Sequence, residues 1–517
     1  MTAHQLLDRD ATGQAAAVAA GEVDAAELVA ASLDRIGRLD DHLRAIVSLR
    51  GTDALTEVHH GRGDSPFFGV PLLLKDHLCE LEGEPLWYGL RPLLDADHRP
   101  DTDSHLAARF RQAGFAILGR TVTSELALAI TPESDLFPRP RNPWDLNRSP
   151  GGSSAGAAIS VASRMVPIAH GTDMAGSIRV PAAWCGVVGL KPSRGRVSVG
   201  PTFGEHAVGL TQQFVLCRSV RDAAATLDAV AGYAPGDPSA APPPTRAWRS
   251  TLHDPKVPLR IGVATQSPWS GPVDPQIRAA VHQVADLLED AGHEVTQAHP
   301  PALGETGYRQ AHALLVAAHA GDEVRRLGRL IGRQIATEEI GIATAWLIES
   351  GRDLSAASLL DTVRFVHGWA RRCLSWWTSE RSSTETSVDG GGFDLLLTPT
   401  VPYLPPPIGS VDETAATVFT GPFNLTGQPA ISLPTHLSWE GLPIGVQLVA
   451  APWREDLLFR VAAQLEVATA WQDRHPNLTG QLAGDHAPAL VVPSPGTVDV
   501  TAGLHRTVLH GSQENTA

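Results

Sequence analysis

Serines that follow glycines are the first residues here that could do chemistry. The segment GGSSAG places Ser153 and Ser154 directly after two glycines, and the segment GTDMAGSIR places Ser177 directly after Gly176. Glycine lets the backbone adopt unusual dihedral angles and approach a ligand closely. Several backbone N–H groups can then point at one oxygen and stabilise the oxyanion that forms when a serine attacks a carbonyl carbon. The pattern suits acyl transfer, although an isolated Gly/Ser run is usually an ordinary turn.

A serine nucleophile needs a base, and the lysines are informative candidates. Only three of the 41 basic residues are lysines, namely Lys75, Lys191 and Lys256. Arginine can replace lysine in most surface roles but cannot lose its proton, so a retained lysine is a candidate base. Lys75 follows the apolar run GVPLLL, where burial would lower its pKa, although a charged Asp76 could oppose this shift. The alternative for Lys75 is an ordinary cation at a strand end, and we expect a structural role for Lys191.

Buried strands and helices are predicted around these residues. The apolar run over residues 70–74 predicts a strand, and a helix over about residues 103–113 leads into the strand AILGR, an alternation that favours an α/β fold. A proline-rich coil over residues 132–150 delivers the chain to GGSSAG, and an alanine-rich buried helix is predicted over residues 154–163. At the N-terminus we expect a helix over residues 3–20, followed by a second helix that opens with a capping box at Asp24 and Glu27.

A proline-rich linker over about residues 239–258 divides the chain into two halves. Beyond it we predict a strand over residues 259–265, a helix capped by Asp274, and the strands HEVTQA and FDLLLTPTVP. Four tryptophans lie in helical patterns, where core packing is the usual role and lining an acyl pocket is the alternative; they are Trp346, Trp369, Trp376 and Trp377. From residue 478 the periodicity is lost, so we expect residues 478–517 to form a disordered tail.

Together these motifs resemble the amidase signature family of serine amidases. The resemblance rests on the segments GVPLLLKD, SPGGSSAG, GTDMAGSIRVPAAWCGVVGLKPSRGRVS and NLTGQPAISLP…GLPIGVQLVA, in the family's order, up to about residue 470. It implies that Lys75 is the base, that Ser153 relays the proton and follows a cis peptide bond, and that Ser177 is the nucleophile. It also implies an oxyanion hole made by the backbone N–H groups of Met174, Ala175, Gly176 and Ser177.

The resemblance further implies the fold class and a catalytic function. We expect an α/β fold with a single large domain over residues 1–477, in which a mixed central β-sheet is flanked by helices on both faces. The implied function is hydrolysis of a linear or cyclic carboxylic amide, and the segment from RGRVSVG to GYAPGDP is most similar to the branch that includes hydrolases of aminohexanoate cyclic dimers. Ala155 and the pair Met174-Ala175 depart from the common glycine-rich pattern, which we expect to alter pocket shape more than catalytic competence.

The same residues allow three alternative functions. GGSSAG also fits the G-x-S-x-G elbow of α/β-hydrolases with Ser154 as nucleophile, but that elbow follows a strand, whereas Arg148-Ser149-Pro150 precedes this one. Within the family, a glutamine-dependent amidotransferase subunit would need a partner chain that receives ammonia. A non-catalytic binding scaffold on the same fold is the third alternative, and the intact lysine and serines speak against it.

Composition bounds the remaining possibilities. A net charge of −15 argues against binding to nucleic acid or to anionic membranes. The four cysteines, which are Cys79, Cys185, Cys217 and Cys373, form no CxxC pair and are expected to be reduced core thiols. With no signal-like N-terminus and no long apolar run, we expect a cytoplasmic protein. We expect a small-molecule amide substrate, neither a metal nor an organic cofactor, and a homodimer as the default assembly.

Overall fold

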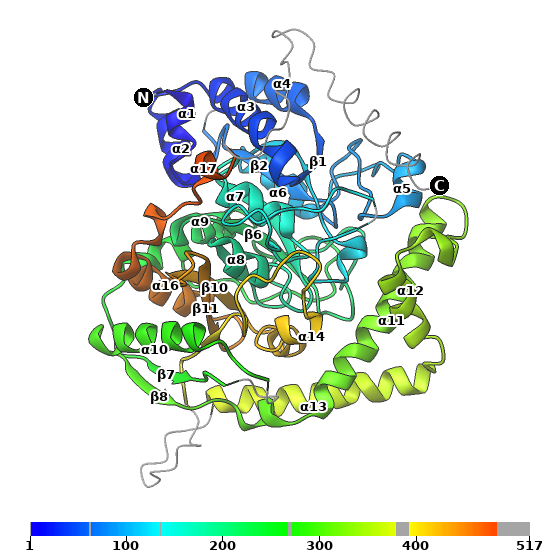
Figure 1. Ribbon diagram of the computed structural model, residues 1–517, viewed down its shortest axis with the longest axis vertical. Helices are drawn as coiled ribbons and strands as arrows, with labels where there is room; N and C mark the ends of the chain where they lie inside the picture. Colours follow the sequence, from blue (N-terminus) through cyan, green and yellow to red (C-terminus); the bar gives the residue numbers. More distant parts are fainter. Residues whose placement is uncertain (1, 62–63, 135, 267–270, 379–391, 483–517) are drawn as a thin grey trace.

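A single mixed β-sheet crosses the whole protein (Figure 1). The computed structural model describes residues 2–61, 64–134, 136–266, 271–378 and 392–482. Eleven strands in these ranges follow the order β1-β3-β2-β4-β6-β5-β10-β11-β9-β7-β8. The strands are β1 (Ile46–Leu49), β2 (Pro71–Lys75), β3 (Ala116–Thr121), β4 (Ile168–Asp173), β5 (Val188–Lys191), β6 (Gln212–Cys217), β7 (Arg260–Val263), β8 (Glu294–Gln297), β9 (Leu395–Pro399), β10 (Ala430–Leu437) and β11 (Pro443–Ala450). The predicted single α/β sheet is therefore confirmed.

Parallel and antiparallel pairs alternate in blocks along this sheet. Strands β3, β2 and β4 run parallel to one another, and so do β9, β7 and β8. Antiparallel pairing through β6, β5, β10 and β11 joins the two blocks. Nearly all strand residues near the centre are buried, as expected for a sheet that is covered on both faces.

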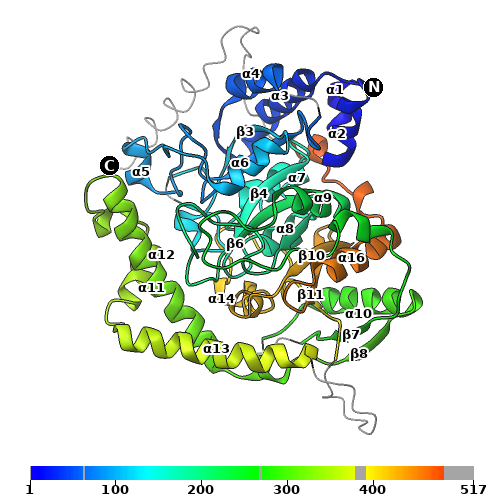
Figure 2. The same ribbon diagram turned by 180° about the vertical axis from the view of Figure 1, so that it is seen from behind.

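Helices cover both faces of the sheet (Figure 2). On one face α7 and α8 pack against each other and over β2, β4, β5, β10 and β11, and on the other face α6, α9, α16 and α10 form a continuous layer. The helices are α1 (Ala3–Leu6), α2 (Ala11–Ala19), α3 (Ala25–Leu43), α4 (Gly51–His60), α5 (Arg91–Asp95), α6 (His105–Gln112), α7 (Ala155–Ala162), α8 (Arg179–Cys185), α9 (Val220–Val230), α10 (Pro275–Asp290), α11 (Gly307–Leu330), α12 (Ile342–Ser350), α13 (Ala356–Thr378), α14 (Glu413–Ala416), α15 (Pro422–Leu425), α16 (Glu455–Thr469) and α17 (Leu478–Leu482).

The N-terminal segment differs from the prediction. Instead of one helix over residues 3–20, the chain forms α1 and α2 with a break between them. The break arises because Asp10 caps α2 by accepting the Gly13 N–H, while the distant Asp222 carboxylate accepts the N–H groups of Ala11 and Thr12. The predicted capping box at Asp24 and Glu27 is present at the start of α3.

Helices α11 and α12 extend along one side of the molecule, and α13 runs along its lower edge (Figures 1 and 2). Trp369, Trp376 and Trp377 on α13 are buried, which confirms core packing for these three. Trp346 on α12 is 68% exposed, so the core expectation is wrong for this residue. Helix α11 also reaches the centre of the molecule, because Tyr308 and Leu315 share a hydrophobic cluster with Met174.

The proline-rich segment between the halves packs against the domain. Residues Trp248–His253 form a 3-10 helix, and the Arg196 guanidinium lies 5.1 Å from the centre of the buried Trp248 ring. The predicted disordered tail over residues 478–517 is wrong for its first five residues, because residues 478–482 form α17, where the Gln481 amide donates to the carbonyls of Pro143 and Trp144. The rest of that tail, residues 483–517, lies outside the described residues.

Helix length and polarity also bear on whether the chain could cross a bilayer. Among the described helices, none combines the length and the apolar character that a membrane crossing requires.

Candidate active site

Lys75 ends strand β2 in the interior of the protein. Its side chain is fully buried, and its Nζ atom lies 2.7 Å from Ser153 Oγ, 2.8 Å from Thr172 Oγ1 and 3.0 Å from Ser154 Oγ. Burial holds the pKa of Lys75 well below its usual value, and the negative charge of Asp173 only partly opposes this. Burial therefore favours the neutral amine, the form that can accept a proton, in line with the expectation from its apolar context.

The neighbouring Asp76 does not oppose the pKa shift of Lys75, which the sequence left open. Its carboxylate accepts the backbone N–H groups of Trp87 and Gly89, and burial raises its pKa to about 6. The acidic residue that acts on Lys75 is Asp173, at the end of β4. Because β2 and β4 are adjacent and parallel, their carboxyl ends place Lys75, Thr172 and Asp173 at one edge of the sheet.

The segment GGSSAG enters the site as coil and continues as α7. The peptide bond between Gly152 and Ser153 is cis, as the resemblance implied. No strand precedes Ser154 within the described residues 136–153, so the geometry of an α/β-hydrolase elbow is absent there. Ser154 is also fully engaged, since its Oγ lies 3.1 Å from the Thr172 carbonyl oxygen and accepts the Thr172 N–H at 3.2 Å.

Ser177 lies beside Ser154 on a separate turn. The Ser154 N–H donates to the Ser177 carbonyl at 3.1 Å, which brings GGSSAG and GTDMAGSIR together although the two serines are 23 positions apart in the sequence. Ser153 and Ser154 are completely buried, whereas Ser177 retains 5% exposure. Of the three candidate serines, Ser177 is thus the least buried.

Residues 174–177, which we call the oxyanion turn, carry free backbone donors. Within the described part of the chain, the N–H groups of these four residues donate to no protein acceptor, whereas the next two, Ile178 and Arg179, donate to the Asp173 carboxylate. Gly176 adopts a φ of +143°, which a residue with a side chain rarely adopts, and Ala175 keeps a negative φ. The substitution of alanine for glycine at position 175 therefore leaves the backbone donors available.

A buried network fixes this turn from below. Arg179 donates to both carboxylate oxygens of Asp173 at 2.9 Å, and it also donates to Asn424 Oδ1 at 2.6 Å and to Gln447 Oε1 at 2.8 Å. Burial alone would raise the pKa of Asp173, but Arg179 brings it down to about 2, so the pair is charged. Because every charge in the network has partners, the network ties β4 and the oxyanion turn to α15 and β11.

Sequence reasoning missed two polar residues of the site, Thr172 and His77. The Thr172 hydroxyl contacts both Lys75 Nζ and, at 3.1 Å, the Nδ1 atom of His77. His77 lies only two residues beyond Lys75, yet no motif marked it, because its contact with Thr172 depends on the pairing of β2 with β4. Lys191, expected to be structural, donates to the carbonyls of Pro192 and Gln428 and takes no part in the site.

Comparisons with known proteins identify the family of this chain. The family model Amidase matches residues 27–459. The 6-aminohexanoate-cyclic-dimer hydrolase of Paenarthrobacter ureafaciens is 37% identical over 91% of this chain and 97% of that protein. A glutamyl-tRNA(Gln) amidotransferase subunit from Moorella thermoacetica is 33% identical over 92% and 98% of the two chains. A structure of 6-aminohexanoate cyclic dimer hydrolase complexed with substrate superposes with a TM-score of 0.85 and 36% identity, covering 91% of this chain and 99% of that one. The chain therefore belongs to the amidase signature family of amide hydrolases.

Proposed function

We propose that Ser177, Ser153 and Lys75 carry out amide hydrolysis through an acyl-enzyme. The observation that carries this proposal is the contact of the buried Lys75 amine with Ser153, next to a turn whose four N–H groups face no protein acceptor among the described residues. Burial lowers the pKa of this lysine and so favours its neutral form. A base and a set of oxyanion donors are the two components that a serine nucleophile needs. The oxyanion donors are the N–H groups of Met174, Ala175, Gly176 and Ser177.

We propose the following order of bond changes at these residues. Ser177 Oγ attacks the amide carbon while its proton passes to Ser153 and the Ser153 proton passes to Lys75. The C–N bond then breaks, the amine leaves with a proton returned along the same path, and the acyl group remains on Ser177. Water attacks the ester in the second half-reaction and releases the carboxylic acid, with the same groups moving the proton.

The substrate class we infer is a small carboxylic amide, either cyclic or linear. The similarity to a 6-aminohexanoate-cyclic-dimer hydrolase supports a cyclic amide as the first compound to assay. The similarity to the amidotransferase of Moorella thermoacetica keeps glutamine hydrolysis as the second candidate, for which activity would depend on a partner chain. A cytoplasmic location is supported by the four cysteines, which are all buried and free.

The assignment is tested by labelling with a serine-directed fluorophosphonate, followed by intact mass and peptide mapping. We expect one adduct on Ser177, and we expect Ser177→Ala and Lys75→Ala each to lose nearly all labelling and nearly all hydrolysis of 6-aminohexanoate cyclic dimer or of a 4-nitroanilide panel. Exposed Lys256→Ala is the matched control and should behave as the parent. An adduct on Ser154, or a Lys75→Ala protein that keeps most of its labelling rate, contradicts the proposal.

A further inference from the structure

The direction in which Lys75 points its lone pair is decided by the groups around it. A neutral amine has two N–H donors and one lone pair, and three hydroxyl oxygens lie within 3.0 Å of Lys75 Nζ. Proton transfer from Ser153 requires that the lone pair face Ser153 Oγ. Both N–H donors must then go to Ser154 and Thr172, which requires each of those oxygens to be an acceptor toward the lysine.

Ser154 meets this requirement through the backbone of β4. Its Oγ lies 3.1 Å from the Thr172 carbonyl oxygen, which can only accept, so the Ser154 proton is directed there. The same Oγ accepts the Thr172 N–H at 3.2 Å. The remaining lone pair of Ser154 is left for a Lys75 N–H.

Thr172 meets the requirement only if its hydroxyl proton points away from the lysine. The other neighbour of Thr172 Oγ1 is His77 Nδ1, at 3.1 Å. If Nδ1 carries no proton, Thr172 donates to it and accepts from Lys75. If Nδ1 carries a proton, Thr172 accepts from His77 and its own proton can occupy the Lys75 lone pair, which would hold the base in an unproductive state.

His77 is held neutral, with its ring fixed by packing. Burial, together with the nearby His206, Lys75, His319 and His170, keeps the pKa of His77 well below its usual value. The ring meets Tyr88 and His206 edge to face, at centroid distances of 5.5 Å and 5.4 Å. Its Nε2 atom is buried and has no hydrogen-bond partner among the described residues, and the aromatic rings packed around His77 can accept an N–H at Nε2 as a weak donor. These contacts favour the tautomer with the proton on Nε2.

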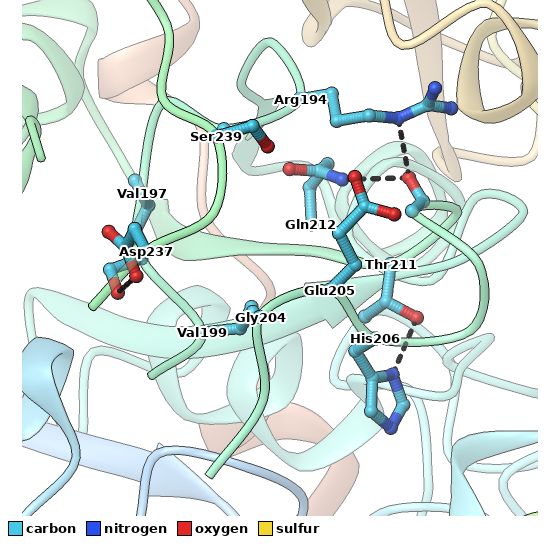
Figure 3. Close-up of a pocket in the computed structure, with 13 residues that line it drawn as sticks. Arg194, Val197, Val199, Gly204, Glu205, His206, Thr211, Gln212, Asp237 and Ser239 are labelled. Carbon is cyan, nitrogen blue, oxygen red and sulfur yellow. Dashed lines mark hydrogen bonds between the residues drawn. The ribbon is translucent and has the colours of Figure 1, made fainter. Parts of the chain in front are cut away.

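A second histidine, His206, packs against the His77 ring and is itself held by a hydrogen bond. His206 Nδ1 lies 2.9 Å from Thr211 Oγ1, a contact drawn in Figure 3 on the rim of a small cavity of about 20 Å³. The His206 ring also packs against His319 of α11 at 4.6 Å. The chain of contacts therefore runs from α11 through His206 and His77 to the base.

We infer that Thr172 and His77 are positioning residues for amide hydrolysis: His77 Nδ1 takes the Thr172 hydroxyl proton, Thr172 Oγ1 accepts one Lys75 N–H, and the Lys75 lone pair is left facing Ser153. The inference rests on the proposed function, because it assigns Lys75 as the base. Thr172 acts on Lys75 directly, and His77 acts on Lys75 through Thr172.

The test measures how fast a fluorophosphonate labels Ser177 as a function of pH, which needs no knowledge of the natural substrate. In the labelling step Ser177 Oγ bonds to phosphorus, fluoride leaves, and the proton passes to Lys75 through Ser153. Thr172→Val removes the hydroxyl at nearly constant shape, and His77→Leu removes the nitrogen acceptor. We expect each variant to label about 10–100-fold more slowly on the plateau, a size typical of a misoriented catalytic group.

Two further readouts separate positioning from loss of structure. Thr172→Ser and His77→Asn, which keep an oxygen near the original atom, should recover at least about tenfold of the lost rate. Both Thr172→Val and His77→Leu should lower the pKa of Lys75 and so move the acid limb of the pH profile to lower pH. Thr172→Val removes an acceptor that stabilises the charged Lys75 ammonium. His77→Leu frees the Thr172 hydroxyl to donate to Lys75, which favours the neutral amine. A general loss of packing would instead let water reach Lys75, which would raise the pKa of Lys75 and move the acid limb to higher pH.

A double-mutant cycle completes the test. Because the two residues act as one unit, His77→Leu should add less than about twofold in the Thr172→Val background. His293→Leu, which alters another buried histidine near β7, is the control and should leave rate and profile unchanged. Three outcomes overturn the positioning role. They are parent-like labelling rates in both single variants, additive losses of rate in the double variant, and an acid limb of the pH profile that stays in place or moves to higher pH. The proposed function fails separately, if Lys75→Ala labels like the parent.

Discussion

At the scale of single residues, the adjacent serines Ser153 and Ser154 differ in their hydrogen-bond partners. Ser153 and Ser154 share the same glycine-rich motif, and both hydroxyls contact Lys75. What separates them is the partner of each proton, since Ser154 already has the Thr172 carbonyl as acceptor. A hydroxyl that is fixed as donor to a backbone carbonyl is a poor nucleophile and a good orienting group.

Replacing Ser154 tests this distinction. We expect Ser154→Ala to slow fluorophosphonate labelling about tenfold, because one hydrogen bond to Lys75 is lost, while the adduct stays on Ser177. Peptide mapping and the labelling rate are the measurements. Ser163→Ala, at the end of α7, removes a comparable buried hydroxyl that donates to the Ile159 carbonyl, and it should label at the parent rate. Complete loss of labelling in Ser154→Ala would contradict the orienting role.

Element scale concerns the oxyanion turn, which must stay open to substrate and yet be rigid. Strand β4 ends at Asp173, which forms an ion pair with Arg179 of α8. Arg179 also donates to Asn424 of α15, which lies 245 positions later in the chain. Thr420 Oγ1 donates to the Ala175 carbonyl at 2.6 Å, so the turn is held through its carbonyl while its N–H groups remain free of described acceptors. This close approach requires glycine at position 176.

Gly176→Ala should therefore disable the site without unfolding the protein. A Cβ atom at Gly176 would lie 2.4 Å from Thr420 Oγ1, and the φ of +143° is unfavourable for alanine. Displacing the turn moves its N–H groups away from the oxyanion, and we expect amide hydrolysis to fall about 100-fold or more. Steady-state kinetics on the most reactive amide gives the measurement.

Gly232→Ala is the matched control for this change. Gly232 also has a positive φ, +109°, but a Cβ there would meet nothing within 4 Å. It should carry the same kind of backbone strain with less than about a twofold effect on rate. Equal losses in the two variants would mean that strain in general, and not the position of the oxyanion turn, limits activity.

At the scale of the whole molecule, segments from the start, middle and end of the chain meet at a cluster of carboxyl groups. Asp10 before α2, Asp222 on α9 and Glu466 on α16 form a cluster of carboxyl groups, in which Glu466 accepts the Val220 N–H at 2.9 Å. Burial raises the pKa of Glu466 to about 7, and the neighbouring Asp222 and Asp10 add to the shift. Burial likewise raises the pKa of Asp222 to about 6.

These shifts make the packing of the two halves sensitive to pH. A carboxyl group whose pKa is raised in the folded state binds its proton more tightly there, so its stabilising contribution is complete below the unfolded pKa near 4.5 and is lost as pH rises through about 7. Glu466→Gln keeps an acceptor for the Val220 N–H and removes the ionisation. We expect the variant to be more stable than the parent at pH 8, by on the order of 1–2 kcal/mol, and equally stable at pH 4.5.

Thermal unfolding followed by fluorescence at pH 4.5 and pH 8 measures this difference. Glu338→Gln, at an exposed position on the α11–α12 connection, is the control and should unfold like the parent at both values. A Glu466→Gln protein that is less stable than the parent at pH 8 would show that the ionised carboxylate is favourable in the fold.

Local sequence patterns predicted strands β2, β3, β7, β8 and β9 and several of the helices. The apolar run before Lys75, the alanine-rich helix after GGSSAG and the box at Asp24 are local patterns, because periodicity and capping depend on residues a few positions apart. The scarcity of lysine pointed to Lys75, and the motif resemblance pointed to Ser153 and Ser177. The break between α1 and α2 escaped prediction because Asp222, over 200 residues away, binds the N-terminus of α2.

Tertiary structure alone decided which polar groups surround the base. The engagement of Ser154 follows from the carbonyl of β4, and the contact of Thr172 with His77 follows from the parallel pairing of β2 and β4. Each of these depends on atoms that are distant in sequence and come together only when the sheet forms. A hydrogen bond depends on the distance and angle between two particular atoms, and a residue pattern along the chain carries neither.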